Sequence, residues 1–548
     1  MNDPGCRGVG SSSDGRMRRV GRKRRKAGPR ISTMAVTVIA TVVMLCLSGC
    51  TDDATAPDPA GPTNLPPIVS KEMSGQGLAA GAPPTAVDLA EYFTDPEGDF
   101  LTFSAASADT SVVVVTMVGS EARVSARKGG ETTMMATAAD PSGQSAAATF
   151  AVRVTQDPDR AALVALFEAT DGPNWMDNTN WLTDAPLDEW YGVSVGSNGR
   201  VESLDLSGRW DWENGGYLPH GLTGQIPPEL GSLTHMETLD LGVNSLTGSI
   251  PPEVGDLSNL EYLALYENDL TGEIPPELGN LSDLRNLTLE GNDLTGEIPP
   301  ELGNLSDLWN LALGNNNLTG QIPPELSNLS GLTNLSIESN NLTGSIPPEL
   351  GDLSGLEYLA LGSNRLAGGI PADLARLSNL GTLYLYENLL HGSIPPELGS
   401  LTQLHTLDLS ANWLLQGLIP PELGKLTSLE WLRLNWTGLG GPLPSELGSL
   451  SRLKELGLEG SGFTGPIPPE LGDLSNLEQF QLGFNYLEGP IPPELGNLSS
   501  LRHLSLSFNE FLSGDIPGTL GNLTSLKSLR LDKNQLTGPI PPELYTIL

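Results

Sequence analysis

The sequence predicts a repeat solenoid with a parallel β-sheet along one face, preceded by a small β-sandwich. Three observations support this fold class. A short motif recurs, mostly every 24 residues, as at Ile250, Ile274 and Ile298. Aromatic residues make up only 5% of the 548 residues, which suits thin stacked coils better than one large core. Short β-branched runs separated by turn residues come before the repeats.

Residues 1–49 have the features of an export signal. A basic run that includes Arg22, Lys23 and Arg24 precedes an apolar stretch from Ile31 to Leu47. The sequence Leu47-Ser48-Gly49-Cys50 follows and resembles the lipobox of bacterial lipoproteins, which implies lipidation of Cys50 after cleavage. The alternative is a membrane-spanning signal anchor, for which the apolar stretch is short. Both interpretations place the rest of the chain outside the cytoplasm.

Residues 50–67 contain Pro, Asp, Ala and Thr but few large apolar side chains, which predicts a semi-extended tether. The lipoprotein resemblance implies a membrane anchor at its start. Because Thr51 is not the aspartate that retains such proteins at the inner membrane, the resemblance implies the outer membrane or the cell surface. Beyond Cys50 the chain has no further cysteine, so thiolate metal sites and disulfides within the body are excluded.

Residues 68–155 are predicted to form the β-sandwich. Strand-like runs cover 112–116 and 150–154, and turn sequences cover 95–99 and 140–143. The segments VDLAEYFTDPEGDFLTFSA and ATAADPSGQSAAATFAVRV resemble cadherin-like and immunoglobulin-like modules of bacterial surface proteins. The resemblance implies a spacer domain.

Some members of that family place calcium near such acidic turns. The residues here that have hard oxygen ligands are Asp95, Glu97, Asp99 and Asp140. The alternative, which we favour, is that these aspartates serve as turn residues, because the sequence does not supply a complete ligand set. Calcium in the β-sandwich is therefore the one cofactor considered for this chain.

The repeats combine two motifs. G-x-[IL]-P-x-x-[LV] occurs fourteen times from Gly224 onwards, and most units also contain L-x-x-L-x-L-x-x-N, as in Leu260 to Asn268. Alternating leucines put one face of a short strand inward, so the intervening residues face outward. The asparagine amide can satisfy backbone groups where the chain turns. Pro-Pro-Glu-Leu begins a short helical turn, with Pro at an initial position and Glu near the positive end.

The full unit resembles the plant-type leucine-rich repeat over about residues 158–548. Residues 156–222 resemble the N-terminal cap of that family with an irregular first repeat, and residues 223–548 form the regular repeats. The family's cap usually has a cysteine pair, which Trp190-Tyr191-Gly192-Val193-Ser194-Val195 lacks. This cap is therefore expected to depend on packing of Trp175, Trp181 and Trp190.

The charge distribution excludes some partners. The net charge is −37; residues 1–50 contain ten basic and two acidic residues, so the remainder has 19 basic and 64 acidic residues, a net of −45. This acidic part of the chain repels nucleic acid and anionic lipid, which are therefore poor candidate ligands. The first explanation of its negative charge is solubility. The five histidines are scattered and no phosphate-binding glycine loop occurs, so we expect no enzyme.

The resemblance implies recognition on the concave sheet of the solenoid. Outward aromatic residues are good binding anchors, although tyrosine also simply suits a strand. The candidates are Tyr262, Tyr266, Tyr358, Tyr384, Tyr386, Trp431, Arg433 and Trp436. We expect a protein or peptide partner, in adhesion or sensing. Two alternatives stay open: a glycan-binding surface protein, and a structural spacer without a specific ligand.

Overall fold

The computed structural model describes residues 64–80, 84–155, 157–211 and 215–546. The predicted export signal, Cys50 and most of the predicted tether lie outside these residues. Within the described residues, no helix combines the length and the apolar character that a membrane crossing requires.

The β-domain contains two sheets that share one core. The larger sheet has the order β2-β9-β8-β5 and the smaller β3-β7-β6, with a separate β1-β4 pair. Their bounds are β1 (Ile68–Val69), β2 (Gln76–Ala79), β3 (Thr85–Asp88), β4 (Phe93–Thr94), β5 (Thr102–Ser107), β6 (Val113–Val118), β7 (Glu121–Ala126), β8 (Gly130–Ala139) and β9 (Ser145–Thr155), with the 3-10 helix η1 (Leu89–Glu91).

The core of this domain joins Val113 and Val124 of the smaller sheet to Met134 and Val152 of the larger one, all almost fully buried. The alternation of buried and exposed residues along β9 follows the period of two that a half-buried strand requires. The domain is therefore a two-layered β-sandwich, as the sequence predicts.

Two residues before the first strand are hydrogen-bonded to the β-domain. The Asn64 amide donates to Asp140 Oδ2 at 2.8 Å and to Ser142 Oγ at 2.9 Å, and Leu65 N donates to Glu97 Oε2 at 3.3 Å. These bonds attach Asn64 and Leu65, near the end of the predicted tether, to the β-domain.

The cap begins with helix α1 (Pro158–Ala169), whose N-cap Asp157 accepts a hydrogen bond from Asp159 N. It continues through η2 (Gly172–Asn174), η3 (Leu187–Glu189), β10 (Val193–Val195), β11 (Val201–Asp205) and the hairpin of β12 (Arg209–Asp211) and β13 (Gly216–Leu218). Trp175 and Trp181 meet edge to face at 4.8 Å between ring centroids, and Trp181 lies 5.0 Å from Trp190. This confirms the expected tryptophan packing.

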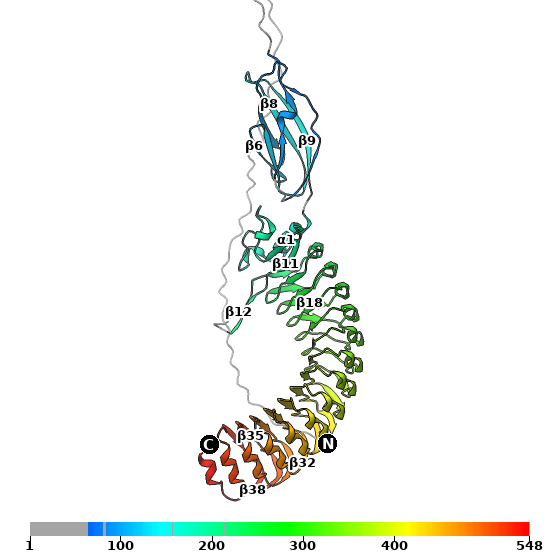
Figure 1. Cartoon of the computed structure of the whole chain (residues 1–548), viewed down its shortest axis with the longest axis vertical. Coiled ribbons are helices and arrows are strands. Elements are labelled where there is room, and N and C mark those ends of the chain that lie inside the picture. The colour runs from blue at the N-terminus through cyan, green and yellow to red at the C-terminus, as the bar shows by residue number, and fades with distance from the viewer. Residues whose placement is uncertain (1–63, 81–83, 156, 212–214, 547–548) are drawn as a thin grey trace, which may run out of the picture. The chain divides into compact units, whose positions relative to one another are not determined.

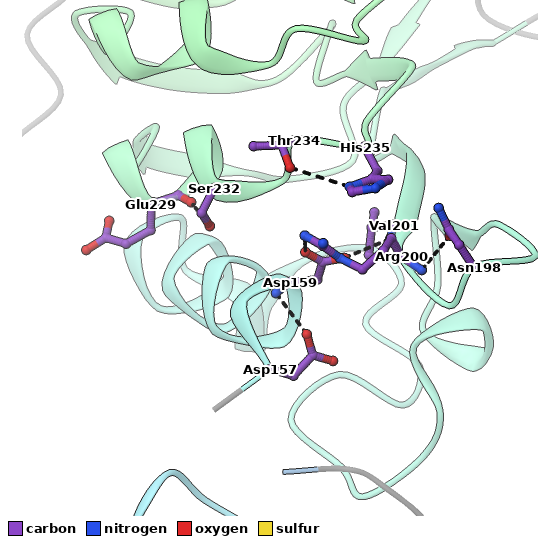
Figure 2. A network of polar contacts seen from close by, with 9 residues as sticks. All are labelled: Asp157, Asp159, Asn198, Arg200, Val201, Glu229, Ser232, Thr234 and His235. Atoms are coloured by element: carbon purple, nitrogen blue, oxygen red, sulfur yellow. Dashed lines mark hydrogen bonds and ion pairs between the residues drawn. The ribbon is translucent and has the colours of Figure 1, made fainter. Parts of the chain in front are cut away.

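An ion pair, which the sequence reading did not predict, also fastens the cap. Asp159 is only 1% exposed, and Figure 2 shows Arg200 reaching it from the start of β11. Arg200 Nε and Nη2 donate to its two carboxylate oxygens at 2.8 and 2.7 Å, and Val201 N donates at 2.9 Å. Helix α1 is thereby attached to the first parallel strand of the array.

The repeats form one continuous sheet on the inner side of a curved array (Figure 1). After the antiparallel β10-β11 pair, every neighbour is parallel and in register, for example Tyr262↔Asn286↔Asn310. The further strands are β15 (Thr238–Asp240), β17 (Tyr262–Ala264), β19 (Asn286–Thr288), β21 (Asn310–Ala312), β22 (Asn334–Ser336), β23 (Tyr358–Ala360), β25 (Thr382–Tyr384), β27 (Thr406–Asp408), β29 (Trp431–Arg433), β31 (Glu455–Gly457), β33 (Gln479–Gln481), β35 (His503–Ser505) and β37 (Ser528–Arg530).

A second line of short parallel strands follows the turn in most repeats, which the sequence reading did not predict. These strands are β14 (Thr223–Gln225), β16 (Ser245–Gly248), β18 (Asp269–Glu273), β20 (Asp293–Thr295), β24 (Ala367–Gly368), β26 (Leu389–Gly392), β28 (Leu414–Gly417), β30 (Gly438–Pro442), β32 (Gly462–Gly465), β34 (Asn485–Gly489), β36 (Asn509–Asp515) and β38 (Gln535–Thr537). Isolated bridges such as Glu297↔Thr319 continue the line where no strand forms.

Each coil closes with a 3-10 helix. Most begin at the second proline of Pro-Pro-Glu-Leu, where the fixed φ of proline suits a first helical residue. They are η4 (Pro228–Ser232), η5 (Pro252–Asp256), η6 (Pro276–Asn280), η7 (Pro300–Asn304), η8 (Pro324–Asn328), η9 (Pro348–Asp352), η10 (Ala372–Arg376), η11 (Pro396–Ser400), η12 (Pro421–Lys425), η13 (Ser445–Ser449), η14 (Pro469–Asp473), η15 (Pro493–Asn497), η16 (Gly518–Asn522) and η17 (Pro542–Thr546).

The repeated asparagine forms the predicted ladder of hydrogen bonds. Asn316 Nδ2 donates to Leu289 O of the preceding coil at 3.0 Å and to Leu313 O at 3.2 Å, while its Oδ1 accepts from Leu294 N at 3.0 Å. Where Thr437 replaces asparagine, its hydroxyl still donates to Leu434 O at 3.0 Å. The ladder provides hydrogen-bond partners for buried backbone groups that are not paired in a β-sheet.

Candidate ligand-binding surface

The candidate surface consists of the outward residues of the concave sheet. On most strands they flank a fully buried leucine, as Tyr262 and Ala264 flank Leu263. They continue into the turn, as Tyr266 and Glu267 do. The leucines pack into the solenoid, so the repeat fixes them. The side chains beside the leucines are not part of the hydrophobic core, so their identities are free to serve recognition.

The first tyrosine cluster comprises Tyr262 and Tyr266, both partly exposed. The ring of Tyr266 lies over Gly242 of the preceding coil, where a Cβ atom would come within 2.4 Å of the ring. Burial raises the pKa of Tyr266 to about 12, and the nearby carboxylate of Asp240 adds to the shift. Burial together with Asp205 raises the pKa of Asp240 itself to about 6.

The second tyrosine cluster comprises Tyr358, Tyr384 and Tyr386. Tyr384 meets both other rings edge to face, with centroid distances of 5.9 Å. The Tyr386 ring lies over Gly362, as Tyr266 lies over Gly242, and its hydroxyl donates to Glu338 Oε2 at 3.0 Å. Burial raises the pKa of Tyr358 to about 12, and the charge of Glu338 adds to the shift.

Between the two clusters the sheet has small side chains in one column and asparagines in the next. The residues that lie between the leucines there are Ala264, Thr288, Ala312, Ser336 and Ala360, of which the three alanines are buried. The neighbouring column runs Tyr262↔Asn286↔Asn310↔Asn334↔Tyr358 in register, so three asparagines join the clusters. Asn310 Nδ2 donates to Asn286 Oδ1 at 3.2 Å. The buried Oδ1 atoms of Asn310 and Asn334 accept no hydrogen bond.

Arg433 and Trp431 lie farther along the sheet and outside both clusters. Arg433 is held on two sides, by a bidentate pair with Glu455 at 2.7 and 2.8 Å and by Asp408 at 3.6 Å. The hydrogen bonds that Arg433 donates to Glu455 raise the pKa of Arg433. Trp431 has the ammonium group of Lys454 5.1 Å above its ring. Both predicted residues therefore have partners within the protein.

Trp436 belongs to a different aromatic row. It lies in the turn after β29 with a φ of 56°, 5.7 Å from Trp413 and 5.9 Å from Phe484, which in turn stacks on Phe508 at 4.2 Å. All four rings are at least 39% exposed. The sequence analysis did not predict Trp413, Phe484 and Phe508. Phe484 and Phe508 precede the repeat asparagine as Trp436 precedes Thr437, which was a usable signal, whereas Trp413 follows Asn412.

The acidic turns of the β-sandwich contain the four candidate calcium ligands. Asp95 Oδ1 accepts from the backbone nitrogens of Glu97 and Asp99, and Asp140 Oδ1 accepts from those of Ser142 and Gln144. Among the described residues, no group of three or more His, Cys, Asp or Glu is placed to hold a metal ion. Asp95 and Asp140 therefore accept hydrogen bonds within their own turns, and calcium binding by Asp95, Glu97, Asp99 and Asp140 stays a prediction.

Comparison with known proteins identifies the repeats. The family model described as Leucine Rich Repeat matches residues 235–257, 259–281, 283–305, 307–329, 331–353, 403–426, 476–498, 500–523 and 525–547. A leucine-rich-repeat protein of Leptospira interrogans is 33% identical with a TM-score of 0.51, over 63% of this chain and 87% of that one. The chain belongs to the leucine-rich-repeat family. A search of curated proteins gives no match.

This leucine-rich-repeat chain is also similar to plant receptor ectodomains. The plant peptide hormone receptor RGFR1, solved in complex with RGF2, is 35% identical with a TM-score of 0.61, over 65% of this chain and 58% of that one. The Arabidopsis thaliana receptor kinase GASSHO1/SCHENGEN3, solved with CASPARIAN STRIP INTEGRITY FACTOR 2, is 34% identical with a TM-score of 0.52, over 70% and 54%. The chain thus spans little more than half of these receptor chains.

Proposed function

We propose that this leucine-rich-repeat protein is a non-enzymatic recognition protein that binds a peptide or protein on its concave face. The observation that carries the proposal is the pair of tyrosine clusters on the outward positions of the sheet. Partly exposed aromatic rings with few rotamers lose little entropy on binding, which makes them effective anchors.

The positions of the tyrosine rings support a role in binding, in addition to the preference of tyrosine for β-strands. Tyr266 and Tyr386 each lie over a glycine of the preceding coil, Gly242 and Gly362, so each ring has a fixed place on the surface. A fixed ring is preorganised for a partner. Similar chains whose structures were solved with peptide ligands, among them RGFR1 with RGF2, support a peptide as partner.

The proposed location is the cell surface. The basic and apolar runs before Leu47-Ser48-Gly49-Cys50 support export and lipidation at Cys50, with the following residues as a tether. The repeat surface would then face the surroundings of the cell, in adhesion or sensing. Radiolabelled palmitate incorporated by the full chain and absent from Cys50→Ser tests the anchor.

The experiment for the binding proposal is affinity capture from surface extracts by the full chain, followed by direct binding of the captured protein. The test variant changes Tyr262, Tyr266, Tyr384 and Tyr386 to Ser. The control changes the 56% exposed Tyr486, which lies on β34 of the other line of strands. We expect a partner that the control retains and the test variant loses by at least about tenfold in Kd.

Other outcomes decide between the alternatives. A partner that both variants retain would place recognition outside the tyrosine clusters. Binding on a glycan array that depends on the tyrosines, without a protein partner, would establish the glycan-binding alternative. No ligand on either assay would leave the structural spacer as the explanation of the array.

A further inference from the structure

Four exposed aromatic rings follow one another along the C-terminal coils. This aromatic row consists of Trp413, Trp436, Phe484 and Phe508, whose ring centroids lie 5.7, 5.9 and 4.2 Å apart in that order. From the coil of β27 to that of β35 the row covers four coil steps, or about 19 Å at about 4.8 Å per strand. Contiguous exposed apolar surface of this kind marks an interaction site.

The turn that holds these rings does not require aromatic residues. Trp436, Phe484 and Phe508 have φ values between 55° and 60°, a region in which bulky residues are outliers. Ser339 and Ala411 occupy the same position in other coils. Because strained positions of this kind cluster at ligand-binding sites, three of them in one row support a role of the rings in binding.

A polar hollow lies beside the aromatic row. It has a volume of about 260 Å³ and lies over β33, β35 and β37 of the concave sheet, of which β35 is labelled in Figure 1. Its polar lining consists of two amides, two hydroxyls, an imidazole, a guanidinium and a carboxylate: Gln479, Gln481, Ser505, Ser528, His503, Arg530 and Glu459. Within the described ranges, none of these seven side chains has a hydrogen-bond or ion-pair partner in the protein, so all are available to a ligand.

Two glycines connect the hollow to the aromatic row. Gly460 directly follows Glu459, and a Cβ atom on Gly460 would overlap the ring of Trp436. Gly483 directly precedes a phenylalanine of the row, and a Cβ atom on it would lie 3.1 Å from both Glu459 Oε1 and Ser505 Oγ. The rings therefore border the hollow, and one ligand can contact the rings and the polar groups together.

The chemistry of these two parts favours a sugar chain. The C–H groups on one face of a sugar ring have a partial positive charge, which suits the negative face of an aromatic ring. Sugar hydroxyls donate and accept hydrogen bonds, as do the amides and hydroxyls of the hollow. The carboxylate of Glu459 and the guanidinium of Arg530 balance each other in charge, which favours a neutral ligand. An apolar peptide anchor would gain little from so polar a lining.

The size of the hollow and the direction of the row favour a chain over a single sugar. Ligand pockets usually have about 300–1,000 Å³, so the smaller hollow accommodates one unit of a longer ligand. The rings belong to successive coils, so further units must extend along the stack of coils to contact them. A β-linked hexose chain is an extended ribbon that presents flat ring faces in this way.

We propose that the aromatic row and the hollow together bind a neutral, extended chain of β-linked hexoses. The sugar rings stack on Trp436, Phe484 and Phe508. One hexose enters the hollow, where Gln481 and Ser505 form hydrogen bonds with its hydroxyls. This site lies outside the tyrosine clusters, so the inference goes beyond the proposed function and does not depend on it.

The test measures the Kd of cellohexaose, a β-linked glucose hexamer, for the full chain by isothermal titration calorimetry. The matched ligand is maltohexaose, its α-linked isomer, which coils instead of extending. The two test variants are a ring variant, Trp436→Ala with Phe484→Ala, and a hollow variant, Gln481→Ala with Ser505→Ala. The control, Trp309→Ala with Tyr545→Ala, removes two rings that are 46% and 71% exposed and lie outside the row.

We expect cellohexaose to bind at least about tenfold more tightly than maltohexaose. The ring variant should lose at least about tenfold in Kd and the hollow variant at least about fivefold, while the control changes less than about twofold. Absence of cellohexaose binding, equal binding of the two hexamers, or equal losses in the ring variant and the control would each overturn the proposal. Trp436→Phe with Phe484→Tyr keeps both rings and should retain binding, which separates loss of stacking from loss of folding.

Two further arms distinguish this site from the tyrosine clusters. The variant with Tyr262, Tyr266, Tyr384 and Tyr386 changed to Ser should bind cellohexaose as the wild type does. A loss equal to that of the ring variant would place the sugar on the tyrosine clusters and overturn this inference. A captured protein partner that the ring variant loses would make the aromatic row a protein-binding surface, which would overturn it as well. A partner lost only by the tyrosine variant would support two separate sites.

Discussion

At the residue scale, the outward positions show what the repeat leaves free. In the turn after the strand, one position has a positive φ in most coils, and residues as different as Glu267, Trp436 and Phe508 occupy it, besides Gly291. A bulky residue in this region of backbone conformation costs about 1–2 kcal/mol. The stacked neighbours fix the turn, so the repeat array tolerates that cost.

Asp240 gives a pH-dependent prediction at the same scale. Its pKa in the folded chain is about 6, above an ordinary value of 3.8, so folding is favoured by its protonated form. Its contribution is therefore fully present below about pH 4 and is lost as the pH rises through 6. Asp240→Asn keeps an oxygen for the hydrogen bond that Gly242 N donates at 3.0 Å.

We expect Asp240→Asn to raise the free energy of unfolding at pH 8 by on the order of 1 kcal/mol and to leave it nearly unchanged at pH 4. Urea unfolding at the two pH values measures the difference. The exposed Glu253→Gln on η5 is the control for loss of one negative charge. A gain of equal size at both pH values would refute the assignment.

At the element scale, the cap shows how a solenoid end is closed without a disulfide. Three tryptophans supply the packing, and Asp159 adds a buried charge that three donors satisfy. Breaking a buried pair by removing one partner costs about 3–5 kcal/mol, because the other charge is left uncompensated. Arg200 is 30% exposed, so water recovers part of that cost.

We therefore expect Asp159→Ala to destabilise the cap by about 2–3 kcal/mol. Hydrogen exchange followed by mass spectrometry should show faster exchange in α1 and β11 and unchanged exchange in the repeats beyond residue 330. Glu168→Ala, at an exposed position of the same helix, is the matched control. Unchanged protection of α1 in the Asp159 variant would show that the tryptophans suffice.

At the scale of the whole molecule, the β-sandwich and the solenoid have separate hydrophobic cores that share no residue. Each core contains a fully buried side chain whose substitution by alanine can be compared with that in the other core. These residues are Met134 in the sandwich and Leu335 in the solenoid. Each truncation to alanine costs about 2–5 kcal/mol where the site cannot collapse.

We expect two calorimetric transitions for the full chain. Met134→Ala should lower the midpoint of one transition only, and Leu335→Ala should lower that of the other only. The wild type under the same conditions provides both reference midpoints. A single transition that both variants shift would mean that the two domains unfold as one unit.

The sequence by itself determined the solenoid, its period, the asparagine ladder and the β-sandwich, because these depend on local repetition. A leucine at every second strand position and a proline at most helical starts have the same consequence in each coil that contains them. The sequence also predicted which residues face outward, including Tyr262 and Tyr386, since alternation along a strand needs no long-range information.

Only the tertiary structure decided which outward residues act together. Residues 24 positions apart become neighbours when coils stack, so Glu338 meets the Tyr386 hydroxyl 48 residues away and Arg433 is held by Asp408 and Glu455. The same stacking put Asp159 against Arg200 and separated Trp436 from the tyrosines. The sequence predicts whether a single residue faces outward. Which residues of different coils are in contact depends on the register of the strands, and the register is defined only when the strands pair.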